Sequence, residues 1–209
     1  MHFSNGARPV VMNGPSRLLS QSGVLSPDGM ALRVVALGGS VTRVSSGVTG
    51  KVPSDDYVRS LPRKRMAGGA LFIDSASRIL LVDPVYRDTW DLRGGAVEAE
   101  ESPYAACRRE VAEELGLDRP PGRVLAVDWV PSRARHPEAL VVVYDGGMLR
   151  TAEIDAITLP QDELAGFAFV AAEEVAIRTT PLVGRRIAAS LEAKTDGTVV
   201  SLEDGCVVG

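Results

Sequence analysis

The chain has little of the chemistry that builds zinc sites or disulfide scaffolds. Its 209 residues contain only two cysteines and two histidines. Cys107 and Cys206 form no C-x-x-C pair and show no metal-ligand spacing, which excludes the common thiolate sites. We expect Cys107 to be a small buried apolar residue and Cys206 to be an incidental thiol. Nothing in this cysteine usage indicates an oxidising compartment, and we expect the protein to be cytoplasmic.

Long hydrophobic runs are also missing. No apolar stretch approaches the length of about 20 residues that a membrane-spanning helix needs. The first 20 residues lack a continuous apolar segment, so a secretory signal is not expected. An acid-poor start with arginine and serine also resembles an organellar transit peptide, and translation from Met30 or Met66 is a further alternative. The sequence therefore predicts a protein with no membrane partner.

The chain carries no overall positive charge. Its formal net charge is −4, which gives no strong signal for nucleic-acid binding. Residues 1–50 contain four arginines and one aspartate, a local balance of +3, which leaves −7 for the rest. An acidic domain that acts on phosphates has to offset this repulsion locally, and a bound divalent cation would do so.

The composition changes along the chain. Residues 1–60 are rich in glycine, serine and valine and are interrupted by Pro9, Pro15, Pro27 and Pro53. We predict that they form a flexible or loosely ordered N-terminal extension. Regular patterning begins near Arg63, and we assign residues 61–209 to one folded domain.

The patterned region predicts strands and helices in mixed order. Met66–Ile73 and Arg78–Val82 are typical of two strands joined in a hairpin. The clearest helix is Ser102–Leu115, with Ser102 as N-cap, Pro103 in the first turn and Gly116 as terminator. The remaining predicted elements are strands at 123–130, 139–144, 164–170 and 198–202, and helices at 171–177 and 181–193. This order favours an α/β fold in which a mixed β-sheet lies between helices.

The predicted helix gathers three acids on one stripe. At about 100° per residue, Glu110, Glu113 and Glu114 lie beside each other, next to an apolar stripe. Such like-charge pairs cost about 0.2–0.5 kcal/mol each on an exposed helix. A hard divalent cation reverses the sign of that interaction, because it prefers carboxylate oxygens. The alternative reading is a solvated acidic face with no ligand.

The residues around these acids follow a longer pattern. The spacing G-x5-E-x7-R-E-U-x-E-E-x-G-U, with U a bulky aliphatic residue, is met by Gly95, Glu101, Arg109, Glu110, Val111, Glu113, Glu114, Gly116 and Leu117. This segment, residues 95–117, resembles the box of the Nudix hydrolases with no position missed. The resemblance extends over roughly residues 63–195, although the box is its only highly specific part.

The resemblance implies a fold, an activity and a metal. Nudix proteins are α/β/α sandwiches that hydrolyse nucleoside diphosphates linked to another moiety, using Mg²⁺ or sometimes Mn²⁺. By similarity, Glu110, Glu113 and Glu114 are the metal ligands, together with the backbone carbonyl of Gly94. Arg109 is expected to hold the glutamates in place, and Glu101 to fix the loop to the helix.

The general base is left open between two sources. One is a glutamate of the box, Glu113 or Glu114. The other is Glu163, which precedes the predicted strand at 164–170, with Asp162 as the nearby competitor. A base must lie within hydrogen-bond reach of the attacking water.

Substrate contacts are predicted for three arginines. Arg133 and Arg135 lie in one loop with His136, and Arg93 directly precedes the Gly-Gly pair. Nudix proteins often have proline before that pair, so Arg93 predicts reduced activity or altered phosphate contacts. Tyr86 and Trp90 are aromatic candidates for stacking on a base, with core packing the favoured role for Trp90.

Together these observations predict a pyrophosphatase of the Nudix type that binds magnesium. It would hydrolyse a pyrophosphate linkage in a nucleotide, ADP-ribose or nucleotide-sugar substrate. The alternatives are a Nudix-like module that senses a nucleotide without turning it over, and an acidic structural domain. The expected partner is a nucleotide-like small molecule, and a homodimer is left open.

Overall fold

The computed structural model describes residues 53–134 and 136–209. The chain divides into two compact units, Met1–Arg59 and Ser60–Gly209. The predicted extension, 1–60, therefore lies mostly outside the described residues. Its described end holds the short helix α1 (Asp55–Ser60), which begins with two acids and has Arg59 in its last turn, the arrangement that suits the helix dipole.

The unit from Ser60 to Gly209 is built on one mixed sheet of eight strands. Their order is β6-β2-β1-β5-β4-β7-β8, and β3 pairs with β1. β1 runs parallel to β5, and β4 runs parallel to β7, whereas the other pairs are antiparallel. The strands are β1 (Arg65–Ile73), β2 (Ile79–Pro84), β3 (Arg93–Ala96), β4 (Val124–Val130), β5 (Ala139–Met148), β6 (Leu164–Val170), β7 (Val200–Glu203) and β8 (Cys206–Val207).

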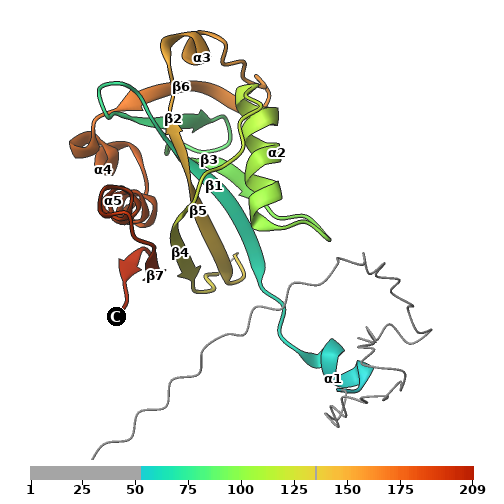
Figure 1. Ribbon diagram of the computed structural model, residues 1–209. Coiled ribbons are helices and arrows are strands. Elements are labelled where there is room, and N and C mark those ends of the chain that lie inside the picture. The colour runs from blue at the N-terminus through green and yellow to red at the C-terminus, as the bar shows by residue number, and fades with distance from the viewer. Residues whose placement is uncertain (1–52, 135) are drawn as a thin grey trace, which may run out of the picture. The chain divides into compact units, whose positions relative to one another are not determined.

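Helices cover both faces of this sheet (Figure 1). Helix α2 (Pro103–Leu115) lies on one face, and α4 (Val175–Arg178) and α5 (Pro181–Asp196) lie on the other. The remaining helices are short, α3 (Thr151–Asp155) and the 3₁₀ turn η1 (Ala172–Glu174). The predicted α/β/α sandwich with a mixed sheet is confirmed.

Alternation along the strands produces two cores. In β1, Leu71 packs in the cluster that also holds Val183 and Ile187 of α5. Its neighbour Phe72 packs in the other cluster, with Cys107, Val111 and Leu115 of α2. Successive strand residues point to opposite faces, so each strand contributes to both cores.

The box helix is positioned by its cap and by a glycine under it. The hydroxyl of Ser102 accepts a hydrogen bond from the Ala105 amide at 3.1 Å, as the N-cap prediction requires. A Cβ added at Gly68 in β1 would lie 2.1 Å from the carbonyl oxygen of Pro103. Glycine at this position therefore lets the start of α2 lie directly against the sheet.

The structure corrects several sequence predictions. Arg93–Ala96, for which no strand was predicted, forms strand β3 because it pairs with Ala67–Ala70 of β1. The segment 171–177, expected to be one helix, is divided into η1 and α4. Helix α3 and strand β8 were not predicted, since each is too short to show a period.

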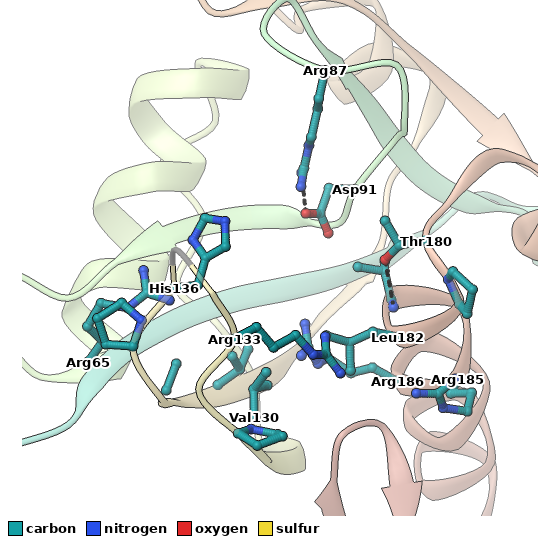
Figure 2. A pocket seen from close by; sticks show the side chains of 16 residues that line it. Arg65, Arg87, Asp91, Val130, Arg133, His136, Thr180, Leu182, Arg185 and Arg186 are labelled. Carbon is teal, nitrogen blue, oxygen red and sulfur yellow. Dashed lines mark hydrogen bonds and ion pairs between the residues drawn. The ribbon is translucent and has the colours of Figure 1, made fainter.

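The sandwich leaves a pocket of about 610 Å³ on the α5 side of the sheet (Figure 2). Its walls come from β1, the β4–β5 loop, the start of α5 and the segment between β2 and β3. Within the described residues, no helix has the length and apolar character that crossing a bilayer requires.

Candidate functional site

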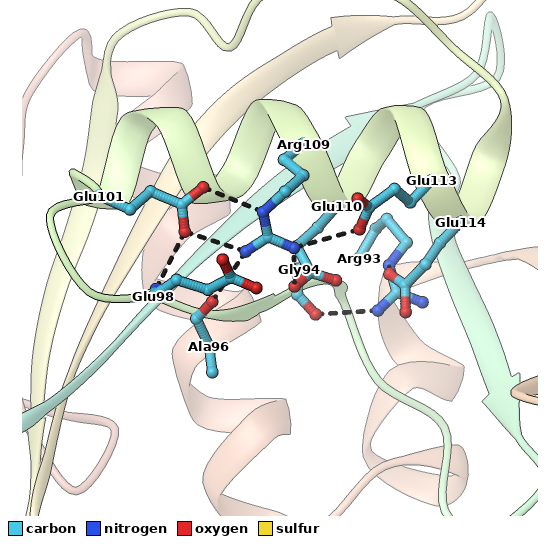
Figure 3. A network of polar contacts seen from close by, with 9 residues as sticks. All are labelled: Arg93, Gly94, Ala96, Glu98, Glu101, Arg109, Glu110, Glu113 and Glu114. Carbon is cyan, nitrogen blue, oxygen red and sulfur yellow. Dashed lines mark hydrogen bonds and ion pairs between the residues drawn. The ribbon is translucent and has the colours of Figure 1, made fainter.

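The side chain of Arg109 organises the acids of the box (Figure 3). Its guanidinium donates to both carboxylate oxygens of Glu101, at 3.0 and 2.9 Å. It also donates to Glu110 at 2.9 Å, to Glu113 at 3.1 Å and to the carbonyl oxygen of Ala96 at 3.1 Å. Hydrogen bonding to Glu101, above all, raises the pKa of Arg109. The arginine thus holds glutamates from the loop and from the helix in one frame.

Glu101 connects the loop to the helix, as the resemblance implied. Its carboxylate pairs with Arg109 and also accepts a hydrogen bond from the Glu98 amide at 3.0 Å. The hydrogen bonds from Arg109, and then the one from Glu98, lower the pKa of Glu101. The loop before α2 is therefore fixed by an ionised carboxylate.

Gly95 leaves room for the first acid of the helix. A Cβ at this position would lie 2.1 Å from Oε1 of Glu110 and 2.2 Å from its carboxyl carbon. Any side chain at residue 95 would displace the Glu110 carboxylate. The Glu110 carboxylate can occupy this position only because residue 95 has no side chain.

Arg93 reaches the proposed metal ligands directly. Its guanidinium donates to the carbonyl oxygen of Gly94 at 2.8 Å and forms an ion pair with Glu114. The side chains of Arg93 and Glu114 are both buried, with 7% and 10% exposed. The ion pair joins Nε of Arg93 to Oε2 of Glu114, an oxygen that is fully buried. A cationic side chain thus lies between the two groups to which the sequence assigned a cation.

The environment of Glu114 favours its protonated form. Burial raises the pKa of Glu114 to about 7, and the negative charges of Glu110 and Glu163 add to this effect. The positive charge of Arg93 opposes it only in part. The carboxylates of Glu110 and Glu114 from α2, and of Glu163 from the loop before β6, are therefore close enough to interact electrostatically around one small space.

That volume is a polar pocket of about 130 Å³, which we call the box pocket. It is lined by Arg93, Gly94, Glu114 and Glu163, together with Tyr86, Arg87 and Asp91. Glu163 thus lies where the sequence placed a second acid. Its competitor Asp162 is exposed and does not line this pocket.

Comparison with known proteins decides the family. The sequence profile of the NUDIX domain matches residues 63–191, more than half of the chain. The protein belongs to the Nudix family.

Two curated relatives match shorter segments. The chain is 37% identical to the mRNA-decapping enzyme subunit 2 of Saccharomyces cerevisiae over 62 residues, which are 30% of this chain and 6% of the yeast protein. It is 32% identical to an RNA pyrophosphohydrolase of Pseudomonas fluorescens over 73 residues, which are 35% of this chain and 46% of the relative. The chain therefore spans less than half the length of these relatives.

Solved structures support the fold. The crystal structure of a MutT protein from Methanosarcina mazei superposes with a TM-score of 0.53 at 22% sequence identity. The match covers 66% of this Nudix chain and 99% of the other. At this identity the likeness extends to the fold alone.

The donor set of the Nudix box fits a divalent cation. It consists of carboxylate and carbonyl oxygens, the ligands that Mg²⁺ prefers, and it includes the buried Oε2 of Glu114, whose partner is the Arg93 guanidinium. Within the described residues, however, no three acids, histidines or cysteines are already gathered as a metal site. The reason is that Arg109 holds Glu110 and Glu113 while Arg93 holds Glu114. The residues fit the cation once the Arg93 side chain turns away.

The predicted substrate residues lie in different places. Arg93 faces the box pocket, whereas Arg133 and His136 line the larger pocket. Arg135 lies outside the described residues. Trp90 packs against the core on the α5 side, as favoured, and Arg178 stacks over its ring at 5.1 Å. Tyr86 is 74% exposed and lines the box pocket, so it alone of the two aromatics is free to contact a ligand there.

Sequence reasoning missed the other basic residues of the larger pocket. Arg65, Arg87, Arg185 and Arg186 line it beside Arg133. They come from separate segments and belong to no motif. No local pattern in the sequence indicates that these arginines lie together in the folded protein.

Proposed function

We propose that this Nudix protein is a Mg²⁺-dependent hydrolase of pyrophosphate linkages in nucleoside diphosphate-linked substrates. One observation carries the proposal. The complete box folds so that Gly94, Glu114 and Glu163 line one small pocket, with Glu110 and Glu113 held beside it by Arg109. The name of the Pseudomonas fluorescens relative, an RNA pyrophosphohydrolase, agrees with this chemistry.

The reaction adds one water across a phosphoanhydride. The water oxygen forms a bond to one phosphorus, the bond from that phosphorus to the bridging oxygen breaks, and two phosphate-terminated products leave. Bound Mg²⁺ would neutralise phosphate charge and acidify the attacking water. Glu110, Glu113, Glu114 and the Gly94 carbonyl would hold the cation, and Arg109 would keep the glutamates in position.

We assign the general base to Glu163. It lines the box pocket but comes from the loop before β6, so it is not one of the acids that Arg109 holds. No ion pair of Glu163 occurs among the described residues, which leaves its carboxylate available to accept a proton. Glu113 is the alternative, although its carboxylate already accepts a hydrogen bond from Arg109.

The test is steady-state hydrolysis of a panel of nucleoside triphosphates, ADP-ribose, nucleotide sugars and 5′-triphosphorylated RNA, with and without Mg²⁺. We expect Glu114→Gln and Glu163→Gln each to lower kcat by about 100-fold or more. Glu192→Gln, an exposed acid on α5, is the matched control and should retain wild-type rates. Equal rates for wild type and Glu114→Gln would contradict the proposal.

The second candidate is a nucleotide sensor, and the position of Arg93 favours it. A guanidinium between Gly94 and Glu114 provides the positive charge that a non-catalytic phosphate site needs. Binding of a panel compound by isothermal titration, without release of phosphate or nucleoside monophosphate, would support this candidate over the hydrolase.

A further inference from the structure

The larger pocket is lined by several basic side chains. We call it the arginine pocket and define it by Arg65, Arg87, Arg133, His136, Arg185 and Arg186. Asp91 is the only acid in its lining. Figure 2 shows Arg65 and His136 on one side, Arg185 and Arg186 of α5 on the opposite side, and Arg87 above them.

Not all of these arginines are available to a ligand. Arg186 is buried and donates to Asp128 at 2.7 Å, so its charge is already neutralised. Arg87 forms an ion pair with Asp91. These two residues shape the pocket rather than supply its charge.

The available charge comes from the other three arginines. Arg133 and Arg185 share a single carboxylate, that of Asp204. Arg65 is exposed and has no ion pair or hydrogen bond of its side chain among the described residues. Glu138, an acid in the chain segment that follows Arg133 and His136, does not neutralise them, because it pairs with Lys64 at 2.6 Å and accepts a hydrogen bond from the Trp129 indole. Three guanidiniums and the one carboxylate of Asp204 leave a local net charge of 3 − 1 = +2 at the pocket, while the chain as a whole carries −4.

The start of helix α5 strengthens the attraction for anions. Thr180 caps this helix and, with Leu182, belongs to the pocket wall. The helix dipole places partial positive charge at this end. Val130, Pro131 and Leu182 add apolar surface, so the pocket suits a ring as well as a charged group.

The arginine pocket adjoins the box pocket. Arg87 and Asp91 line both, so a ligand that extends past these residues would occupy both spaces. A volume of about 610 Å³ accommodates a group of the size of a nucleoside. The part of a substrate beyond its pyrophosphate would thus meet Arg65, Arg133 and Arg185, whose charges exceed that of their one shared carboxylate.

We propose that the arginine pocket binds a phosphate group that the substrate carries on its nucleoside, away from the scissile pyrophosphate. The substrate class is a pyrophosphate-linked nucleotide with an additional phosphomonoester on its ribose. Guanidinium groups bind phosphate through two parallel hydrogen bonds, which a neutral hydroxyl cannot replace. This inference rests on the proposed function only for the orientation of the substrate.

The test compares ligands that differ only in that phosphate. Isothermal titration without divalent cation measures binding in the absence of turnover. The pairs are 2′-phospho-ADP-ribose with ADP-ribose, and coenzyme A with dephospho-coenzyme A. We expect the phosphorylated member of at least one pair to bind at least tenfold more tightly.

Two variants and a control locate the effect. Arg65→Gln, and Arg65→Gln combined with Arg133→Gln, should reduce the tenfold preference to less than threefold. Arg108→Gln is the matched control, because its exposed pair with Asp118 lies outside the pocket, and it should keep the preference. Thermal unfolding of each variant shows whether it is folded, and Arg65, which holds no partner, is the change least able to disturb folding.

The outcomes separate this inference from the proposed function. Equal affinity within both pairs, or no measurable binding of any of the four compounds, would overturn the arginine pocket as a phosphate site. A preference retained in the double variant would also overturn it. If the preference is present and lost in the variants, but neither these four compounds nor the substrate panel above is hydrolysed with Mg²⁺, the pocket stands and the hydrolase proposal fails.

Discussion

Arg93 directs its guanidinium to the Gly94 carbonyl oxygen and to the Glu114 carboxylate. These are two of the groups that the Nudix box offers to a cation. Arg93 therefore acts as a tethered positive charge at this position. If the proposed Mg²⁺ site is correct, the cation has to displace this guanidinium, because both would contact the same oxygens.

Replacing Arg93 with methionine tests this competition. The change leaves Glu114 buried without its cation, so the metal-free protein should lose about 3 kcal/mol of unfolding free energy at pH 8. Added Mg²⁺ or Mn²⁺ should raise the unfolding temperature more in the variant than in wild type, because no side chain must be displaced. Differential scanning calorimetry with and without metal measures both effects. Metal shifts of equal size in the two proteins would contradict the competition.

Gly95→Ala tests the contact between the turn and the helix. The added methyl group would overlap the Glu110 carboxylate, so we expect metal affinity to fall by about 10–100-fold with the fold retained. Manganese titration followed by electron paramagnetic resonance provides the measurement. Gly166→Ala is the control, because a Cβ there meets nothing within 4 Å. Unchanged manganese affinity in Gly95→Ala would show that Glu110 is not a ligand.

The buried pair of Asp128 and Arg186 should matter more for stability than an exposed pair. Asp128 accepts from Arg186 at 2.7 Å and from the Gly205 amide at 3.0 Å. Asp128→Ala leaves a buried guanidinium unpaired and should cost about 3–5 kcal/mol of unfolding free energy. Asp118→Ala, which breaks the exposed pair with Arg108, should cost about 0–1 kcal/mol. Urea denaturation of the two variants compares them directly.

Asp74 should make stability depend on pH at acid values. Burial alone would raise its pKa, but hydrogen bonds from Arg78 and the Ala76 amide outweigh burial, and the pKa lies below the ordinary value of 3.8. The stabilisation is therefore present above about pH 4 and is lost as the pH falls through the lowered pKa. Asp74→Asn should cost about 1–3 kcal/mol at pH 7. The curves of wild type and variant, measured by urea denaturation, should converge as the pH falls below this lowered pKa. A constant difference would contradict this account.

The two thiols should react very differently. Burial, and then the nearby charge of Glu110, raise the pKa of Cys107 to about 12, whereas Cys206 is exposed in β8. Because the thiolate is the nucleophile, Ellman's reagent at pH 8 should modify one thiol in the native protein. Both thiols should react in guanidinium chloride. Rapid reaction of two thiols under native conditions would place Cys107 outside the core.

Local signals predicted the parts of the fold that local chemistry determines. Helix α2 was located from Ser102, Pro103 and Gly116, because a cap, a first-turn proline and a left-handed terminator are encoded within a few residues. Strand β3 was missed because a Gly-Gly pair has no strand preference of its own. Its extended conformation comes from pairing with β1, a contact between distant segments.

The candidate site divides in the same way. The acids of the box and Glu163 were identified because their spacing is fixed along one chain segment or beside one strand. Of the arginine pocket the sequence pointed only to Arg133 and His136, since Arg65, Arg185 and Arg186 are brought to it by the sheet and by α5. The ion pair between Arg93 and Glu114 was likewise invisible, because it depends on β3 turning the arginine inward.

The turn between β7 and β8 holds two arginines of the arginine pocket in place. Asp204 in this turn holds Arg133 of the β4–β5 loop and Arg185 of α5, and its amide donates to the Trp129 carbonyl oxygen at 2.8 Å. Gly205 beside it caps Asp128. A truncation after Thr198 would therefore remove the carboxylate that holds two arginines of the pocket, although no residue of the Nudix box would have changed.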